Sequence, residues 1–150
     1  MSQDKNTGNN HSLREPEFYN KWRSLFQFLV THVFYMIRFK LVYRLEVYGK
    51  ENIPDDNNFI VAANHLSTLD PPLVCGVMNK PVAYMAKKEL FENPFLCWWL
   101  NWLGAFAVDR EKLGVSTIKT VKNLKNTGWV LGIFPQGTRQ EAGEISHITK

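Results

Sequence analysis

Short apolar runs that alternate with helical patterns restrict the fold of this chain more than any other feature. Strand-like runs occupy residues 45–48, 59–63, 82–86, 106–108 and 129–134. Helical patterns lie between them, at residues 73–78, from Asn93-Pro94 to Gly104, and at residues 115–126. Because strands and helices alternate, the sequence predicts an α/β fold with a largely parallel sheet flanked by helices.

The run at 59–63 leads directly into a turn that carries a histidine and a carboxylate. His65 and Asp70 lie five positions apart, and Pro71 and Pro72 suit the first turn of a helix. In α/β folds, chemistry commonly sits on such strand-to-helix turns. A histidine can accept a proton near neutral pH, and a nearby carboxylate can fix its tautomer and stabilise the imidazolium. His65 and Asp70 are therefore candidate catalytic residues.

A simpler interpretation of the same turn remains open. Asp70 in front of two prolines also has the features of a plain helix N-cap. In that case His65 would be a hydrogen-bonded histidine at the end of a strand, with no chemical role.

A second strand end carries a cation. The run at 129–134 continues into Pro135, Gln136, Gly137, Thr138 and Arg139. A guanidinium on such a turn is suited to a bidentate grip on a phosphate.

Together, the two turns resemble the glycerolipid acyltransferase family, whose best-known members are 1-acylglycerol-3-phosphate acyltransferases. The family block N-H-x-x-x-x-D is matched by Asn64, His65 and Asp70. The block F-P-E-G-T-R is matched at Phe134, Pro135, Gly137, Thr138 and Arg139. A block of glycine and apolar residues that ends in a basic residue looks like residues 104–110. The resemblance covers roughly residues 45–145.

This resemblance implies an O-acyltransferase that needs no cofactor and no metal. The acyl group would move from a thioester, on coenzyme A or acyl carrier protein, to the free hydroxyl of a glycerol phosphate. The expected acceptor is lysophosphatidic acid, which would give phosphatidic acid in phospholipid biosynthesis. His65 and Asp70 would be catalytic, and the phosphate would be bound by Arg139, Thr138 and Gly137. Supporting positions are Asn64, Pro135, Gln136, Gly104 and Arg110.

The chain has no G-x-S-x-G motif, so a serine hydrolase of that kind is unsupported. A histidine and an aspartate without a protein nucleophile predict direct transfer. The acceptor's own hydroxyl would attack the thioester while His65 removes its proton.

Two departures from the family pattern affect these expectations. Gln136 stands where the family usually has glutamate, and glutamine has nearly the same shape but is uncharged and can donate hydrogen bonds. The sequence ends at Lys150, before the family's fourth block, so residues 45–150 are expected to be an acyltransferase domain that is incomplete at its C-terminus. The alternatives are a catalytically inactive, membrane-associated interaction module, another lysophospholipid or glycerol-3-phosphate acyltransferase, and a thioesterase.

The net charge of +4 favours acidic partners, either an anionic membrane surface or a phosphorylated substrate. Nucleic acid is not expected, because no module signature or dense basic stripe is present. Cys75 and Cys97 form neither a disulfide framework nor a zinc pattern, which suggests a reducing, cytoplasmic environment.

The N-terminal part of the chain differs from the rest. Residues 1–16 read as a disordered polar tail. Residues 17–44 read as an amphipathic helical segment at the membrane interface, because their apolar stretch at 24–37 is shorter than the about 20 residues of a spanning helix. The expected location is therefore the cytoplasmic face of a membrane. A helix packed on the domain's own core and a spanning helix are the alternatives.

Two helix faces can also be predicted. At residues 115–126, Ile118, Val121 and Leu124 are expected to face the core. Trp98, Trp99 and Trp102 are expected not to share one side of their helix. Contact of some of them with lipid or an acyl chain is one interpretation, and core packing is the alternative.

Overall fold

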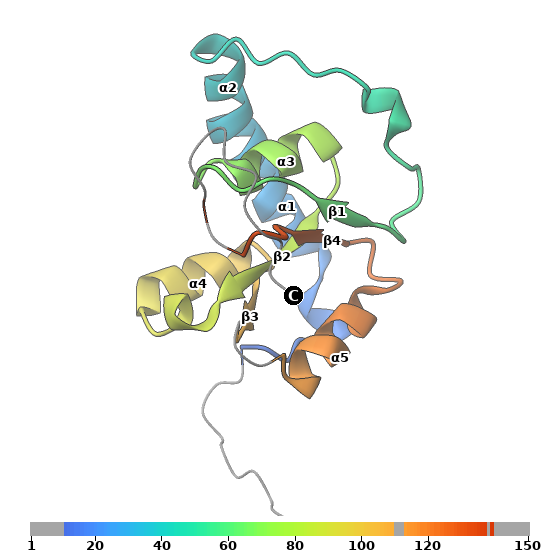
Figure 1. The fold of residues 1–150 in the computed structure, drawn as a ribbon, viewed down its shortest axis with the longest axis vertical. Coiled ribbons are helices and arrows are strands. Elements are labelled where there is room, and N and C mark those ends of the chain that lie inside the picture. Colours follow the sequence, from blue (N-terminus) through green and yellow to red (C-terminus); the bar gives the residue numbers. More distant parts are fainter. Residues whose placement is uncertain (1–10, 110–112, 138, 140–150) are drawn as a thin grey trace, which may run out of the picture.

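The computed structural model describes residues 11–109, 113–137 and 139, and it shows an α/β fold (Figure 1). The sheet contains β1 (Ile60–Ala62), β2 (Val82–Lys87), β3 (Phe106–Val108) and β4 (Val130–Ile133). Its spatial order is β1-β4-β2-β3, and all neighbouring strands are parallel. The predicted α/β architecture and parallel sheet are confirmed.

One expected strand is absent from the described residues. Residues 45–48 lie in an irregular segment between Arg44 and Gly49, which both have positive φ, at 50° and 75°. None of these residues belongs to the four-stranded sheet, and Tyr48 is 85% exposed. The prediction of a strand at 45–48 is therefore wrong, and β1 forms one edge of the sheet.

The register of the sheet aligns the ends of two strands that are far apart in sequence. Ala62, the last residue of β1, pairs with Ile133, the last residue of β4. The Ala63 N–H donates to the Ile133 carbonyl at 3.2 Å, which extends the pairing by one step. The two turns that carry the candidate site residues consequently leave the same edge of the sheet side by side.

Helices cover both faces of this sheet (Figure 1). On one face, α5 (Val115–Leu124) contacts β3 and β4, and Leu124 packs with Ala83, Phe106 and Leu131 in the main apolar core. On the other face, α3 (Asp70–Met78) contributes Cys75, whose thiol lies 3.9 Å from the Tyr84 hydroxyl of β2. Helix α4 (Pro94–Trp102) is capped by Asn93, whose side chain accepts hydrogen bonds from the N–H groups of Phe95 and Leu96 in its first turn.

The buried face of α5 agrees with the prediction at Leu124 and Val121, which pack in the main core, but differs from it at Ile118. Thr117 and Thr120 are buried, whereas Ile118 is 49% exposed. Thr120 Oγ1 donates to the Ser12 carbonyl at 2.6 Å and accepts from the Arg14 N–H at 2.7 Å. The helix turns this threonine inward because its hydroxyl serves backbone groups of the N-terminal segment.

The N-terminal segment from His11 onward is ordered. The His11 carbonyl accepts from the Ala107 N–H at 2.9 Å on the outer side of β3, and the His11 ring stacks on Phe91. Asn123 of α5 donates to the Arg14 carbonyl at 2.9 Å. The prediction of a disordered tail is therefore wrong for residues 11–16, while residues 1–10 lie outside the described part of the chain.

A continuous helical stretch follows and packs on the domain. It consists of α1 (Lys21–Leu29), a π-helix (Val30–Met36) and α2 (Ile37–Leu41). Gln27 is buried, donates to the carbonyls of Val82 and Leu103 at 2.8 Å, and accepts from the Val82 N–H at 2.9 Å. Met36 contacts α3 where a side chain at Gly76 would clash, since a Cβ there would lie 2.2 Å from the Met36 sulfur. One face of the stretch thus packs on the protein's own core, which was one of the alternatives.

The opposite face of this stretch is apolar and exposed. Large apolar side chains there have more than two-fifths of their surface exposed. They are Trp22, Leu25, Phe28, Leu29, Val33, Phe34, Ile37 and Leu41. Within the described ranges, no helix has both the length and the apolar character needed to cross a bilayer.

The three tryptophans of α4 do share one side. Phe26 of α1 contacts the rings of Trp98, Trp99 and Trp102, at centroid distances of 6.3, 5.7 and 5.4 Å. Positions i, i+1 and i+4 span an arc of only about 100° on a helix. The prediction that these residues cannot share one side was therefore wrong.

Candidate active site

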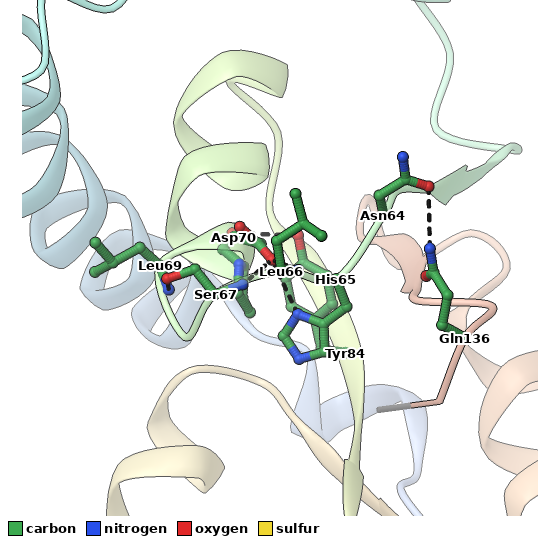
Figure 2. A network of polar contacts seen from close by, with 9 residues as sticks. Asn64, His65, Leu66, Ser67, Leu69, Asp70, Tyr84 and Gln136 are labelled. Atoms are coloured by element: carbon green, nitrogen blue, oxygen red, sulfur yellow. Dashed lines mark hydrogen bonds and ion pairs between the residues drawn. The ribbon is translucent and has the colours of Figure 1, made fainter. Parts of the chain in front are cut away.

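The first turn brings His65 and Asp70 into contact. His65 Nδ1 lies 3.0 Å from Asp70 Oδ2, and both side chains are largely buried, at 17% and 19% exposure (Figure 2). The Leu66 and Ser67 N–H groups donate to the same carboxylate oxygen, at 2.6 and 2.7 Å. The chain between the two residues therefore wraps around the carboxylate.

This geometry decides against the plain N-cap interpretation of Asp70. Asp70 is the first residue of α3, and its side chain accepts no hydrogen bond from the first turn of that helix. Its bonds point back toward the turn instead. Ser67 has a turn role as well, since its hydroxyl accepts from the Leu69 N–H at 3.1 Å.

The environment keeps Asp70 charged. Partial burial raises the pKa of the carboxyl, but hydrogen bonds from the Ser67 N–H, the His65 ring and the Leu66 N–H outweigh it and leave the pKa below the ordinary value of 3.8. An ionised Asp70 requires the His65 ring to carry its proton on Nδ1. The other ring nitrogen, Nε2, is then free to accept a proton.

A stack of three aromatic rings holds His65 on its other side. The His65 ring stacks on Phe134 with a centroid distance of 4.3 Å, and Phe134 stacks on Tyr84 at 5.4 Å. The Tyr84 hydroxyl donates to the Pro71 carbonyl at 3.2 Å, beside Asp70. Rings from β2 and from the end of β4 thus orient a histidine that follows β1.

Sequence reasoning did not identify Tyr84 as part of this arrangement. The available signal was Gly132 in the middle of an apolar strand, because an isolated glycine in a strand often marks a close approach. A Cβ at position 132 would lie 2.4 Å from the Tyr84 ring and 2.6 Å from a methyl group of Val82. Gly132 therefore leaves the room that the Tyr84 ring occupies.

The second turn presents Arg139 near the first. The Gly137 N–H donates to the Phe134 carbonyl at 2.9 Å, and Gly137 has a φ of 69°, a conformation that glycine adopts most easily. Pro135 occupies the second position of this turn, where its fixed φ is suitable. Arg139 is exposed, and Thr138 lies outside the described residues.

A hydrogen bond joins the two turns directly. Gln136 Nε2 donates to Asn64 Oδ1 at 3.1 Å (Figure 2). Asn64 precedes His65, and Gln136 lies on the turn that leads to Arg139.

His65 and Arg139 line one cavity of about 560 Å³. Its remaining wall is rich in apolar side chains, which come from the π-helix, from α4 and from the segments beside β2 and β3. They include Val30, Leu90, Leu100, Leu103 and Ala105. The cavity therefore brings an imidazole, the cationic side chains of Arg139 and Lys87, and an extended apolar surface into one space.

The third motif contributes differently. Gly104 is buried at the end of α4 with a φ of 76°, and a Cβ there would lie 2.2 Å from the Trp129 ring. Its place in the structure is explained by backbone conformation and close packing. Arg110 lies outside the described residues.

Comparison with known proteins agrees with these observations. The family model described as Acyltransferase matches residues 44–150. A 1-acyl-sn-glycerol-3-phosphate acyltransferase of Bacillus subtilis is 45% identical over 96 residues, which cover 63% of this chain and 48% of that protein. A Saccharomyces cerevisiae protein of the same name is 32% identical over 128 residues, which cover 83% of this chain and 42% of that protein.

A solved structure matches as well. The crystal structure of the 1-acyl-sn-glycerophosphate acyltransferase PlsC from Thermotoga maritima has a TM-score of 0.51 and 35% sequence identity with this chain. The match covers 68% of this chain and 39% of that one. The chain thus spans about half the length, or less, of the relatives that it matches.

The bonds around Asp70 predict an acid-dependent loss of stability. Because the pKa of Asp70 is lowered in the folded state, the unfolded state takes up a proton first as the pH falls through 3.8. The stabilisation is present above pH 3.8 and is lost as the pH falls through the folded pKa. We expect Asp70→Asn to flatten this loss, measured as unfolding free energy against pH. Glu92→Gln, which removes an exposed carboxylate, is the control, and an unchanged slope in Asp70→Asn would contradict the prediction.

Proposed function

The chain belongs to the acyltransferase family, and from this premise we propose that it transfers an acyl group from an acyl thioester to the free hydroxyl of a glycerol phosphate acceptor. The preferred acceptor is lysophosphatidic acid, and the product is phosphatidic acid, in phospholipid biosynthesis. The observation that carries the proposal is the single cavity lined by His65, Arg139 and a mostly apolar wall.

Binding of the acceptor is the first step. Its phosphate pairs with the exposed guanidinium of Arg139, whose planar fork suits two phosphate oxygens. Because Arg139 and His65 line the same cavity, a bound acceptor can extend its hydroxyl toward His65. Positioning of this kind accounts for a large share of catalysis in two-substrate reactions.

Proton transfer and acyl transfer follow. His65 Nε2 takes the proton of the acceptor hydroxyl, and Asp70 stabilises the imidazolium through Nδ1. The hydroxyl oxygen bonds to the thioester carbonyl carbon, and the carbon–sulfur bond then breaks. The proton on His65 passes to the departing thiolate, so that the products are an ester and a free thiol of coenzyme A or acyl carrier protein.

The apolar part of the cavity suits the hydrocarbon chain of an acyl substrate. The lining side chains Val30, Leu100 and Leu103 come from the N-terminal helical stretch, from α4 and from the residue after α4. The same N-terminal stretch exposes an apolar face on its other side, which includes Trp22, Phe34 and Leu41. One helical stretch therefore links the cavity to a surface suited to lipid.

We propose that this exposed face binds the surface of a membrane at its cytoplasmic side. Apolar side chains of an amphipathic helix enter the interface, and the basic residues Arg38 and Lys40 beside them favour an anionic leaflet. Cys75 and Cys97 are free thiols, which suits a reducing compartment.

Removing the base should abolish transfer. We expect His65→Ala to lower the rate about 100- to 10,000-fold, which is the usual contribution of a general base. The assay follows labelled acyl groups from acyl-coenzyme A into lysophosphatidic acid, and thermal unfolding shows whether the variant is folded. His32→Ala is the histidine control, since His32 stacks on Phe28 and does not line the cavity. A variant that keeps more than about a tenth of the wild-type rate would exclude His65 as the base.

Replacing the planar guanidinium of Arg139 should weaken binding of the acceptor but not of the acyl donor. Arg139→Lys keeps the charge but loses the planar fork, so we expect the KM for lysophosphatidic acid to rise about tenfold while the KM for the acyl donor changes little. Arg38→Lys is the matched control on α2. A defect confined to the KM of the donor would move Arg139 to the thioester side of the site.

The exposed apolar face should determine membrane binding. We expect Trp22→Ser, Phe34→Ser and Leu41→Ser each to weaken sedimentation with vesicles that contain anionic phospholipid, without a change in thermal stability. Added salt should also weaken the binding of the wild-type chain, because surface charges are screened. Val115→Ser changes an equally exposed apolar residue on α5, on the other face of the sheet, and should bind like the wild type. Equal binding by all four variants would contradict the proposal.

A further inference from the structure

We infer that the amides of Asn64 and Gln136 form an uncharged clamp that positions the His65 turn against the Arg139 turn. The part of this inference that concerns phosphate binding rests on the proposed function, whereas the clamp itself does not. It makes both residues positioning residues, because neither is assigned a contact with the reacting atoms.

The clamp lies where the two turns diverge. β1 and β4 are held together by sheet pairing up to Ala63 and Ile133, and beyond that point Gln136 Nε2 donates to Asn64 Oδ1 at 3.1 Å (Figure 2). Asn64 is the chain neighbour of His65, and Gln136 is three residues before Arg139. A shift in this bond would therefore be transmitted to the base and to the phosphate-binding cation together.

The chemistry of the pair restricts which replacements can work. An amide both donates and accepts hydrogen bonds, whereas a carboxylate only accepts. The bond therefore survives when either partner becomes a carboxylate, provided that the other remains an amide. Two carboxylates at this distance lack a donor and repel each other, unless they share a proton.

The neutral side chain of Gln136 affects how strongly the turn attracts the phosphate of the acceptor. The family usually has glutamate at the position of Gln136, and that carboxylate would add a negative charge to the turn that carries Arg139. A neutral glutamine leaves the field of the guanidinium unopposed at that position, which favours a phosphate. In this chain the clamp thus provides position without weakening attraction for the anionic group.

A double-mutant cycle on the full chain tests the clamp. The variants are Asn64→Asp, Gln136→Glu and the double variant. The control is Asn58→Asp, which makes the same chemical change at an exposed position before β1. Thermal unfolding and the affinity for lysophosphatidic acid below its micelle-forming concentration are measured at about pH 7.5 and about pH 5.5, since carboxyl pairs that share a proton titrate above their ordinary range. Acyl transfer, with separate KM values for donor and acceptor, is measured at the higher pH.

We expect the affinities of the two single variants for the acceptor to differ by no more than about threefold, because each variant adds one negative charge and keeps the hydrogen bond. The double variant should bind about tenfold more weakly than the product of the two single effects, and should recover at the lower pH. The acceptor KM should rise more than the donor KM. Additive effects at both pH values, or a loss in the double variant that low pH does not restore, would overturn the clamp.

The two proposals fail separately. Absence of acyl transfer by the wild-type chain would contradict the proposed function, but non-additive unfolding with recovery at low pH would still support the clamp. Transfer by the wild type together with an additive cycle would contradict the clamp alone.

Discussion

The parallel pairing of β1 with β4 is the constraint on which the candidate site depends. Ala62 lies opposite Ile133, so the two strands end at the same level of the sheet. The turns that follow them are separated by about seventy residues in the chain, yet they share an edge, a ring stack and an amide hydrogen bond. A slip of one residue would point each side chain of the strand to the opposite face and would separate these contacts.

Packing on both faces of the sheet then supports the geometry at its edge. Gly132 leaves room for Tyr84, the Tyr84 ring supports Phe134, and Phe134 supports His65. On the carboxylate side, the Leu66 and Ser67 N–H groups hold Asp70 in its charged form. The histidine is thus fixed from both sides by groups that come from different strands and turns, which restricts its ring to one orientation and one tautomer.

The N-terminal helical stretch combines two environments. Gln27 satisfies backbone groups of Val82 and Leu103 in the interior, where an unpaired polar group would cost about 1–3 kcal/mol. A few residues further on, Val30 and Tyr35 line the cavity, while the outer face exposes large apolar side chains. The stretch therefore packs on the domain through one face and exposes apolar side chains on the other, which is the face that the proposed membrane binding would use.

The sequence alone predicted the α/β class and the positions of β1 to β4 within one residue, because strand length, prolines and glycines are local signals. It also placed His65, Asp70 and Arg139 on two turns that follow strands, and the structure brings these turns to one edge of the sheet. It could not determine the order β1-β4-β2-β3, the ring stack, the role of Gln27 or the inward turn of Thr120, since each depends on partners distant in the chain. The ordered segment at residues 11–16 was missed for the same reason: a polar stretch without periodicity is held by hydrogen bonds to β3 and α5 that only the tertiary structure creates.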